Sequence, residues 1–355
     1  MSSHDSPLHR ILIVRTDRLG DVLLTLPMLS VLRTCFPGAH IAMLLRQYTG
    51  DLVVGNPHVD ELIWYDDVDK LIPFGKMVAT LRERAFDAAI VVYPRVRLAW
   101  LMFRSGIPVR VGTGYRFYSS LFNRKVYEHR KDAQRHEVEY NLNLLSQLNC
   151  GLPKVLKPEF LIDVPASAEQ RAQEVLASSG VGTQEFVVVH PGSGGSAREW
   201  PPEFFGSLAN RFANDGLKVI VTGGSGDEEK VAQVVRVSNG QAVPVVAKLR
   251  LKELCALVRA AKLFVSNSTG PLHLAVAMKT PVVGLFPQHT AMSVKRWGPY
   301  TDNKAVFVPD RPLDCNACIE NKTSCACMAS ISVEQVYEGA VKLLNANKRK
   351  ATINA

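Results

Sequence analysis

The feature that most constrains this chain is a regular alternation of short apolar runs with helix-like segments, repeated in both halves of its 355 residues. Such alternation is typical of a parallel sheet covered by helices. In the first half we expect helices at residues 20–34 and 136–148. Strands are expected there at residues 11–14, 41–45, 61–65, 88–92 and 109–112. The sequence therefore predicts an α/β fold.

Prolines divide the two halves. Pro153, Pro158 and Pro165 interrupt residues 150–165, and proline lacks the backbone donor that a helix or strand needs. In the second half, strands are expected at residues 186–190, 219–222, 263–266 and 282–286, and helices at 202–214, from 227, at 270–278 and at 332–344. We therefore expect two doubly wound domains, residues 1–165 and 166–331, facing a central cleft, followed by a terminal segment, 332–355.

The net charge of +9, with a pI of about 9.2, favours an anionic partner, such as a phospholipid surface, a phosphorylated substrate or a nucleic acid. The polar N-terminal residues 1–10 lack the apolar core of a leader segment. No apolar run reaches the roughly 18–20 residues of a spanning helix. We expect a cytoplasmic protein.

Asp21 is the candidate catalytic residue of the first domain. It lies in the segment that follows the first expected strand, which also holds Gly20 and should face the cleft. Arg18 in this segment is a candidate acceptor-binding residue. Asp21 could be an ordinary acidic residue in the first turn of a helix. It could also be a general base that takes a proton from an acceptor hydroxyl.

Turns suited to phosphate follow strands of the second domain. Small residues and an arginine follow the strand at 186–190. A glycine-rich turn follows the strand at 219–222, and a hydroxyl-rich turn follows the strand at 263–266. Such turns expose backbone N–H groups at helix starts. The alternative readings are a solvated loop and a simple helix cap. The candidate donor-binding residues are Ser193, Gly194, Arg198, Thr222, Gly223, Asp227, Glu228, Ser268, Thr269, Gly270 and His273.

Ten basic residues stand against two acidic ones between residues 95 and 135, interleaved with aromatic side chains. Arg95 and Arg97 follow an expected strand, so we expect them to bind acceptor phosphates at the cleft mouth. The segment contains no recognisable nucleic-acid-binding module. Anionic lipid or a phosphorylated acceptor fits better, so no nucleic-acid partner is expected.

The sequence contains neither a dinucleotide-binding glycine motif nor a P-loop, which disfavours a dehydrogenase or an NTPase. Asp67 and Asp69 have the spacing of a cation-binding pair, but they stand in an acidic turn that we expect to be exposed. Four cysteines gather near the C-terminus, and we weigh structural zinc, reduced thiols and disulfides for them. These cysteines are Cys315, Cys318, Cys325 and Cys327.

Several motifs together resemble glycosyltransferase family 9, which contains the ADP-heptose:lipopolysaccharide heptosyltransferases. They are GDVLLTLP at 20–27, HPG at 190–192 followed by REWP at 198–201, and NSTGPLH at 267–273. The resemblance implies a GT-B fold with the acceptor on the first domain and the donor on the second. It also implies inverting transfer without a metal or other cofactor, and a terminal helix that crosses back to the first domain.

By position, the resemblance makes Asp21 the catalytic base and places Arg198 near the donor phosphates. Thr269, Gly270 and His273 match the donor-binding turn. Ser268 departs from the aspartate that usually contacts heptose, and either Asp227 or Glu228 matches a carboxylate near the donor. The expected partners are an ADP-sugar, an acidic glycolipid such as the lipopolysaccharide core, and the cytoplasmic membrane surface.

We therefore expect Asp21 to deprotonate the acceptor while Arg198 and the backbone N–H groups at residues 269–270 stabilise the leaving diphosphate. Two alternatives stay open. One is a transferase of the same fold that uses a different nucleotide sugar. The other is a non-catalytic protein that binds acidic glycolipid or nucleic acid.

Overall fold

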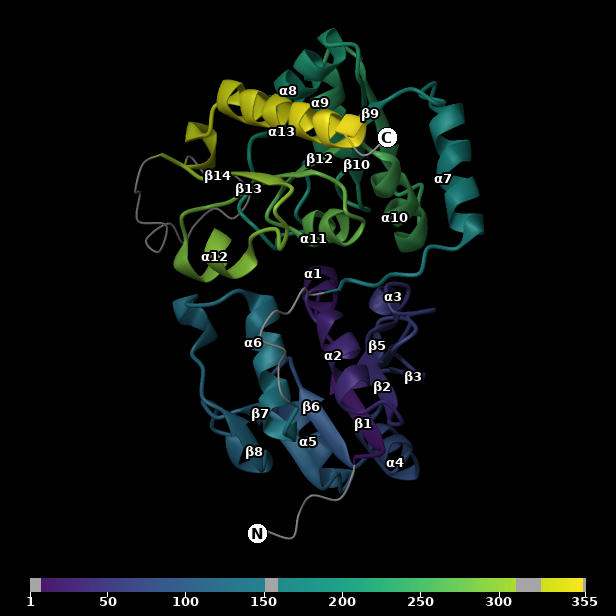
Figure 1. The fold of residues 1–355 in the computed structure, drawn as a ribbon, viewed down its shortest axis with the longest axis vertical. Coiled ribbons are helices and arrows are strands. Elements are labelled where there is room, and N and C mark those ends of the chain that lie inside the picture. The colour runs from purple at the N-terminus through teal and green to yellow at the C-terminus, as the bar shows by residue number, and fades with distance from the viewer. Residues whose placement is uncertain (1–7, 151–158, 311–326, 354–355) are drawn as a thin grey trace. The chain divides into compact units, whose positions relative to one another are not determined.

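The structure is a computed structural model that describes residues 8–150, 159–310 and 327–353 (Figure 1). The chain divides into two compact units between Asp163 and Val164, and the short segment Lys131–Gln134 groups with the second unit. The expected domain boundary at residue 165 lies two residues from this division. Within the described residues, no helix is both long and apolar enough to cross a membrane.

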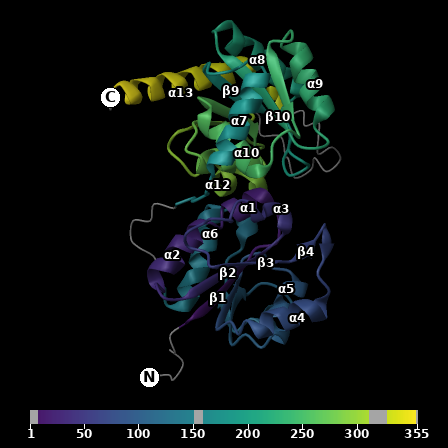
Figure 2. The same ribbon diagram turned by 90° about the vertical axis from the view of Figure 1, so that its right-hand side faces the viewer.

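The first unit is built on a six-stranded sheet with the order β3-β2-β1-β6-β7-β8, and every strand pair in it is parallel. Figure 2 shows helices α2 and α6 on one side of this sheet and α4 and α5 on the other. The strands are β1 (Arg10–Val14), β2 (His40–Leu45), β3 (Glu61–Trp64), β6 (Ala88–Val91), β7 (Val109–Thr113) and β8 (Arg124–Val126).

Alternate side chains of these strands point to opposite faces of the sheet. Leu12 and Val14 of β1 face the cluster formed with α4 (Phe74–Glu83) and α5 (Val96–Arg104). Because both faces are covered, β1 is apolar almost throughout and its residues from Ile11 to Val14 are fully buried.

The second unit repeats the arrangement, with the sheet order β11-β10-β9-β12-β13-β14 and all pairs parallel. Both units thus have the doubly wound order in which the first strand lies at the point where the winding reverses. This confirms the predicted fold class. The strands are β9 (Phe186–His190), β10 (Lys218–Gly223), β11 (Ala242–Val246), β12 (Leu263–Asn267), β13 (Val282–Leu285) and β14 (Lys304–Phe307).

Helix α8 (Pro202–Asn214) covers one face of the second sheet, with Phe205 and Phe212 fully buried against β9 and β10. Its start is fixed by Trp200, whose indole N–H donates to the carbonyl of Ile331 at 2.9 Å. The terminal helix α13 (Val333–Ile353) packs against α8 and β14 in this unit (Figure 1). Its expected crossing to the first unit stays a prediction.

The helix expected at residues 20–34 is wrong as a single element. The structure has α1 (Leu19–Leu23) and a separate α2 (Pro27–Cys35). Pro27 has no N–H to continue the first helix, so it begins the second one instead. Tight turn bonds from Thr25 and Leu26 back to the end of α1 make the junction.

Helices α4, α5, α7 (Ala166–Ser178) and α10 (Leu251–Ala260), and strands β8, β11 and β14, were not anticipated. The segment expected to be helical at 136–148 is α6 (Glu137–Asn143) continued by a 3₁₀ helix, η3 (Leu144–Leu148). Strands β8, β11 and β14 lie at the edges of their sheets and are only partly buried. Helices α5 and α10 each have a buried apolar stripe, so a signal for them was present in the sequence.

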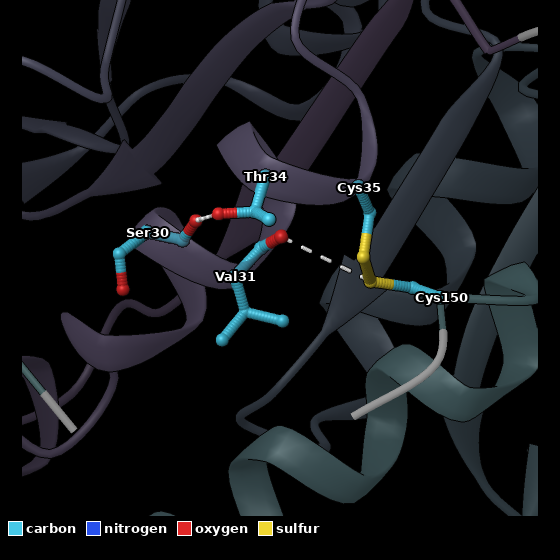
Figure 3. Close-up of a disulfide and its surroundings, with 5 residues drawn as sticks. All are labelled: Ser30, Val31, Thr34, Cys35 and Cys150. Carbon is cyan, nitrogen blue, oxygen red and sulfur yellow. Dashed lines mark hydrogen bonds between the residues drawn. A yellow bond between two sulfur atoms is a disulfide. The ribbon is translucent and has the colours of Figure 1, made fainter. Parts of the chain in front are cut away.

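A disulfide joins Cys35, at the end of α2, to Cys150, just after η3 (Figure 3). Their Cα atoms are 5.7 Å apart, within the ordinary range for a disulfide, and the pair spans 115 positions of the sequence. The sequence did not predict this pair, because residues so distant in sequence meet only after the sheet has formed.

Candidate active site

The carboxyl ends of β1 and β9 are the places where chemistry is expected, because each is the central strand at which the winding reverses. In the first unit β1 leads directly into Arg15 and the segment that ends in α1. In the second unit β9 ends at His190, beside the ends of β10 and β12. We call these the β1 edge and the β9 edge.

A buried guanidinium organises the β1 edge. Arg15 is 2% exposed, and its Nε lies 2.8 Å from Asp17 Oδ1. Its Nη2 contacts Asp21 Oδ1, and its Nη1 lies 4.0 Å from Oε1 of Glu137. Three carboxylates therefore surround one arginine. Sequence reasoning found Asp21 but missed the other two acids and Arg15 itself.

A second arginine extends this cluster. Arg130 donates from Nη1 to Glu137 Oε1 at 2.6 Å and to Asn141 Oδ1 at 2.9 Å. The amide of Asn141 in turn donates to the carbonyl of Leu24 at 2.9 Å, where α1 ends. The chain of contacts joins α6 to the segment after β1, so helix α6 helps fix where Asp21 lies.

The charges of the cluster act on one another. Burial disfavours the charged form of Arg15, but Asp17, Asp21 and Glu137 outweigh it and raise the pKa of the guanidinium. Burial also raises the pKa of Asp17, to about 7, against the opposing effect of Arg15. At neutral pH this edge therefore holds a carboxyl group that is poised between its two protonation states.

Asp21 stands in the first turn of α1, and its side chain is 19% exposed. One oxygen is held by Arg15, which fixes the direction of the carboxylate. A carboxylate that is oriented by a buried cation and still reachable from solvent can accept a proton from a bound hydroxyl. Arg18, the residue before α1, is exposed and adds positive charge beside it.

A small pocket, open to solvent, lies at the carboxyl ends of β6, β7 and β8 in the first unit. Apolar side chains line this pocket together with the polar or charged side chains of Thr113, Glu128 and Arg130. Since Arg130 also contacts Glu137, this pocket shares a residue with the cluster around Arg15.

The two arginines expected to bind acceptor phosphates have different surroundings. Arg97 donates to the Tyr65 hydroxyl at 2.9 Å and to the Ile72 carbonyl at 2.6 Å, so its guanidinium is engaged within the unit. Arg95 is exposed and lies over the ring of Tyr93, 4.6 Å from its centroid. Arg95 is therefore the better placed of the two to meet an anion from solvent.

In the second unit, a buried glutamate holds the loop that follows β9. Glu199 accepts from both the backbone N–H of Ser193 at 3.0 Å and its hydroxyl at 2.6 Å. Lys230, in α9 (Glu228–Val237), donates to the same oxygen at 2.7 Å. Sequence analysis missed both Glu199 and Lys230. The available signal for Lys230 was its position three residues after Asp227, a spacing that brings two side chains together on a helix.

Asp227 is buried at the start of α9, whereas Glu228 is exposed. An oxygen of Asp227 accepts from the N–H of Gly224 at 3.0 Å. A side chain at Gly192 would stand 2.3 Å from the same carboxylate, so only glycine fits there. Glu228 instead accepts from the N–H of Gly226 at 2.8 Å.

Neutral hydrogen bonds complete the β9 edge. Nδ1 of His190 lies 2.9 Å from the Thr222 hydroxyl, and burial lowers the pKa of this histidine to about 4. The side chain of Asn267 accepts from the backbone N–H of Trp200 at 2.9 Å and donates to the Pro191 carbonyl at 2.8 Å. These bonds fix the loops after β9 and β12 to each other.

The turn after β12 leads into α11 (Gly270–Ala277), with Thr269 as the residue before the helix. No side chain caps the helix start. Pro271 has no N–H, and the Leu272 N–H donates to the Thr269 carbonyl at 3.1 Å, so the N–H groups of Thr269 and Gly270 are the candidates for binding an anion. Thr269 and His273 are buried, and Ser268 and Arg198 are half-buried. Gly194 is exposed with φ +54°, a conformation that suits glycine. Gly223 ends β10 beside these turns.

In the described part of the chain, no group of three or more histidine, cysteine or acidic side chains could hold a metal ion. Asp67 and Asp69 stand in an exposed hairpin between the short strands β4 (Asp66–Asp67) and β5 (Lys70–Leu71). Cys315, Cys318 and Cys325 lie outside the described residues, and Cys327 is buried in the second core. Structural zinc at these cysteines stays a prediction.

The chain is similar in sequence and in fold to known proteins. The model of Glycosyltransferase family 9 (heptosyltransferase) matches residues 74–329. Lipopolysaccharide heptosyltransferase 3 of Escherichia coli is 30% identical over 298 residues, covering 81% of this chain and 85% of that protein.

Two solved structures have similar folds. The glycosyl transferase family 9 structure from Veillonella parvula has a TM-score of 0.83 and 25% identity, covering 96% of this chain and 99% of that one. The E. coli heptosyltransferase WaaC with ADP has a TM-score of 0.70 and 20% identity, covering 94% of this chain and 99% of that one.

Proposed function

Since the chain belongs to glycosyltransferase family 9, we propose that it transfers heptose from ADP-heptose to a lipopolysaccharide core or a related acidic glycolipid. The family fixes the enzyme class, a glycosyltransferase of the heptosyltransferase family with the GT-B fold. The observation that carries the proposal is Asp21, a carboxylate held by buried Arg15 at the carboxyl end of β1.

The donor binds at the β9 edge. The start of α11 offers the N–H groups of Thr269 and Gly270 to a diphosphate, and Arg198 and Lys230, which is paired with Glu199, add positive charge in the same unit. A related heptosyltransferase was solved with ADP, and another structure of it holds a fluorinated ADP-heptose. Two cations and a helix start can neutralise the diphosphate, so we propose that no metal takes part.

The reaction is a single displacement. Asp21 takes the proton of the acceptor hydroxyl while its oxygen attacks the anomeric carbon of the donor sugar. The bond from that carbon to the diphosphate breaks, and ADP leaves with the electron pair. Attack opposite the leaving group inverts the anomeric configuration. The N–H groups of α11 stabilise the charge that develops on the diphosphate.

Arg15 and Asp17 position the base. Arg15 holds one oxygen of Asp21 and leaves the other for the acceptor proton. Asp17, with its pKa raised to about 7, competes for the same guanidinium only when it is ionised. We place the acceptor sugar at the pocket at the ends of β6, β7 and β8, which is lined by Arg130, paired with Glu137, and by Glu128, paired with Arg135.

A transfer assay tests the proposal. The purified chain is incubated with ADP-heptose and with lipopolysaccharide that lacks outer heptose, and the glycolipid is analysed by mass spectrometry. We expect a mass increase of one heptose residue, undiminished by EDTA, and a product of inverted anomeric configuration by NMR. Loss of transfer in EDTA would contradict the metal-free mechanism. Absence of transfer with every core acceptor would contradict the proposed substrates.

One observation favours a different donor sugar. Ser268 stands, half-buried, in the turn before α11, where the family usually has an aspartate that contacts heptose. A serine keeps a hydrogen-bonding group but loses the charge. If the natural donor carries another sugar, wild-type protein will use that ADP-sugar better than ADP-heptose. Ser268→Asp will then shift the preference toward ADP-heptose.

A further inference from the structure

The outer face of helix α5 is apolar although it is exposed. Val96, Trp100 and Phe103 are spaced four and three residues apart and are 41%, 44% and 45% exposed. Phe117, in the segment after β7, is 89% exposed. We call these four residues the aromatic surface. The buried face of the helix is a separate stripe, so the exposed one is not needed for the core.

Contacts between α5 and the segment after β7 make this surface continuous. The ring of Trp100 meets that of Phe103 edge to face at 5.8 Å. The guanidinium of Arg110 lies 5.5 Å from the Phe103 ring and donates to the Leu121 carbonyl at 2.8 Å. Leu121 belongs to the 3₁₀ helix η1 (Ser119–Leu121), which packs against α5.

Phe117 stands two residues before η1. Its ring meets that of Tyr118 edge to face at 5.1 Å, and buried Tyr118 precedes η1. Arg95 and Arg116 both lie close enough to Tyr118 to act electrostatically on its hydroxyl. The start of α5 and the segment that carries Phe117 are therefore neighbours.

The charge around this surface has one sign. Between Asp87 and Glu128 the sequence holds seven arginines and lysines and no acidic residue. Among them, Arg95, Arg104 and Arg116 are exposed. Exposed cations usually alternate with carboxylates on a protein surface. Here they border large apolar side chains instead.

We propose that the aromatic surface and its arginines dock the first unit onto an anionic lipid bilayer. Aromatic side chains partition into the interfacial region of a membrane, and arginines pair with anionic headgroups. A protein partner would be expected to need acceptors for these cations, and a nucleic acid would leave the apolar side chains uncovered. A bilayer satisfies both kinds of group at once.

The position of the surface gives it a role, which rests on the proposed function. Pro94 and Thr113 line the pocket proposed for the acceptor sugar, and Arg95 and Arg116 follow within three residues of them. A glycolipid whose acyl chains stay in the bilayer can therefore present its sugar to this pocket. Docking raises the local concentration of the acceptor, while lipid binding itself requires no catalysis.

Flotation with vesicles tests the docking. The full chain is mixed with anionic vesicles of phosphatidylcholine containing about 30 mol% phosphatidylglycerol, and separately with vesicles of phosphatidylcholine alone. We expect binding to the anionic vesicles that weakens as salt rises. Arg104→Gln/Arg116→Gln should reduce the partition constant about 25-fold, since each basic residue contributes about fivefold. Phe117→Ser should reduce it about fivefold, because its exposed ring can enter the interface.

Matched controls come from elsewhere in the chain. Val68 is 79% exposed in the β4–β5 hairpin, so Val68→Ser removes an exposed apolar group outside the surface. Arg171→Gln/Arg259→Gln removes two arginines of the second unit whose side chains are 49% and 44% exposed. Both controls should bind vesicles like wild type. All variants are checked by circular dichroism for a retained fold.

The inference is overturned if the arginine and Phe117 variants bind anionic vesicles as well as wild type does. It is also overturned if wild type ignores vesicles and instead self-associates, or binds nucleic acid, through Phe117. Transfer to an acceptor stripped of its acyl chains separates the two proposals. Normal transfer without vesicle binding removes only the docking surface. Vesicle binding without transfer removes only the proposed reaction.

Discussion

The β1 edge and the β9 edge occupy the same place in two sheets of the same strand order, yet their chemistry is opposite. At the β1 edge, buried Arg15 is surrounded by the carboxylates of Asp17, Asp21 and Glu137. At the β9 edge, the carboxylates of Glu199 and Asp227 accept from backbone N–H groups of the loops, and neutral His190 and Asn267 join those loops. The comparison teaches that the fold fixes where a site lies, and the residues just after the central strand decide what it does.

The difference fits the two tasks of a sugar transfer. A base must be an anion whose direction is fixed, and a buried arginine provides both charge and geometry. A diphosphate site must offer hydrogen-bond donors, and backbone N–H groups at turns and helix starts do so, while Lys230 pairs with the carboxylate of Glu199. If the comparison is correct, substitutions at the β1 edge should impair chemistry, and those at the β9 edge should impair donor binding.

The largest expected effect is that of Asp21→Asn. The amide keeps the size of the side chain and its place at the start of α1 but cannot take a proton. We expect kcat to fall about 10²–10⁴-fold while ADP binding, measured by calorimetry, stays unchanged. Asp67→Asn, in the exposed hairpin, is the matched control and should be silent. Activity within a few-fold of wild type in Asp21→Asn would remove Asp21 as the base.

The next effect concerns pH and His190. Its folded pKa of about 4 lies below the ordinary 6.5, because burial disfavours the charged ring. Between these values the unfolded chain binds a proton that the folded chain does not. The contribution to stability is therefore complete above pH 6.5 and is lost as pH falls toward 4. We expect a loss of up to about 3 kcal/mol.

Hydrogen exchange of the β9 and β10 amides at pH 7 and pH 5 measures this change. His190→Gln should flatten it, since glutamine does not titrate. Asp17 should act in the opposite direction at the β1 edge. Its raised pKa favours the folded unit at low pH, and that contribution is lost as pH rises through about 7. Equal pH slopes at the two edges would break the comparison.

A smaller effect is expected for the lysine of the β9 edge. Lys230→Gln keeps a hydrogen-bond donor for Glu199 but removes the charge proposed to meet the diphosphate. We expect ADP to bind about tenfold to thirtyfold more weakly, the range for a charge-assisted hydrogen bond. Arg236→Gln, on the same helix and exposed, is the control. If only Arg198→Ala weakens ADP binding, the lysine is structural.

Much of this arrangement could be predicted from sequence. Strands β9, β12 and β13 were expected to within one residue at either end, because buried parallel strands are continuous apolar runs. Asp21 and the turn before α11 were found because both directly follow such strands. Glycine and proline marked the turns.

The cluster around Arg15 could not be predicted. Glu137 and Arg130 are more than a hundred positions from Arg15 in the sequence, and only the folded sheet brings them together. Lys230 was missed for the same reason, since its partner Glu199 lies on a different loop. Periodicity identifies elements, whereas ion pairs between elements depend on tertiary packing.

The smallest expected effect separates Arg95 from Arg97, which the sequence treated as equivalent. Arg97 is held by the Tyr65 hydroxyl and the Ile72 carbonyl, so Arg97→Ala should lower the free energy of unfolding by about 1–3 kcal/mol, measured in urea. Arg95 is exposed, so Arg95→Ala should leave stability unchanged and raise the acceptor KM only about threefold to fivefold, the effect of one exposed ion pair. Donor KM should not change in either variant. An acceptor KM that rises with Arg97→Ala alone, at unchanged stability, would show that the structurally engaged arginine is the one that meets the acceptor.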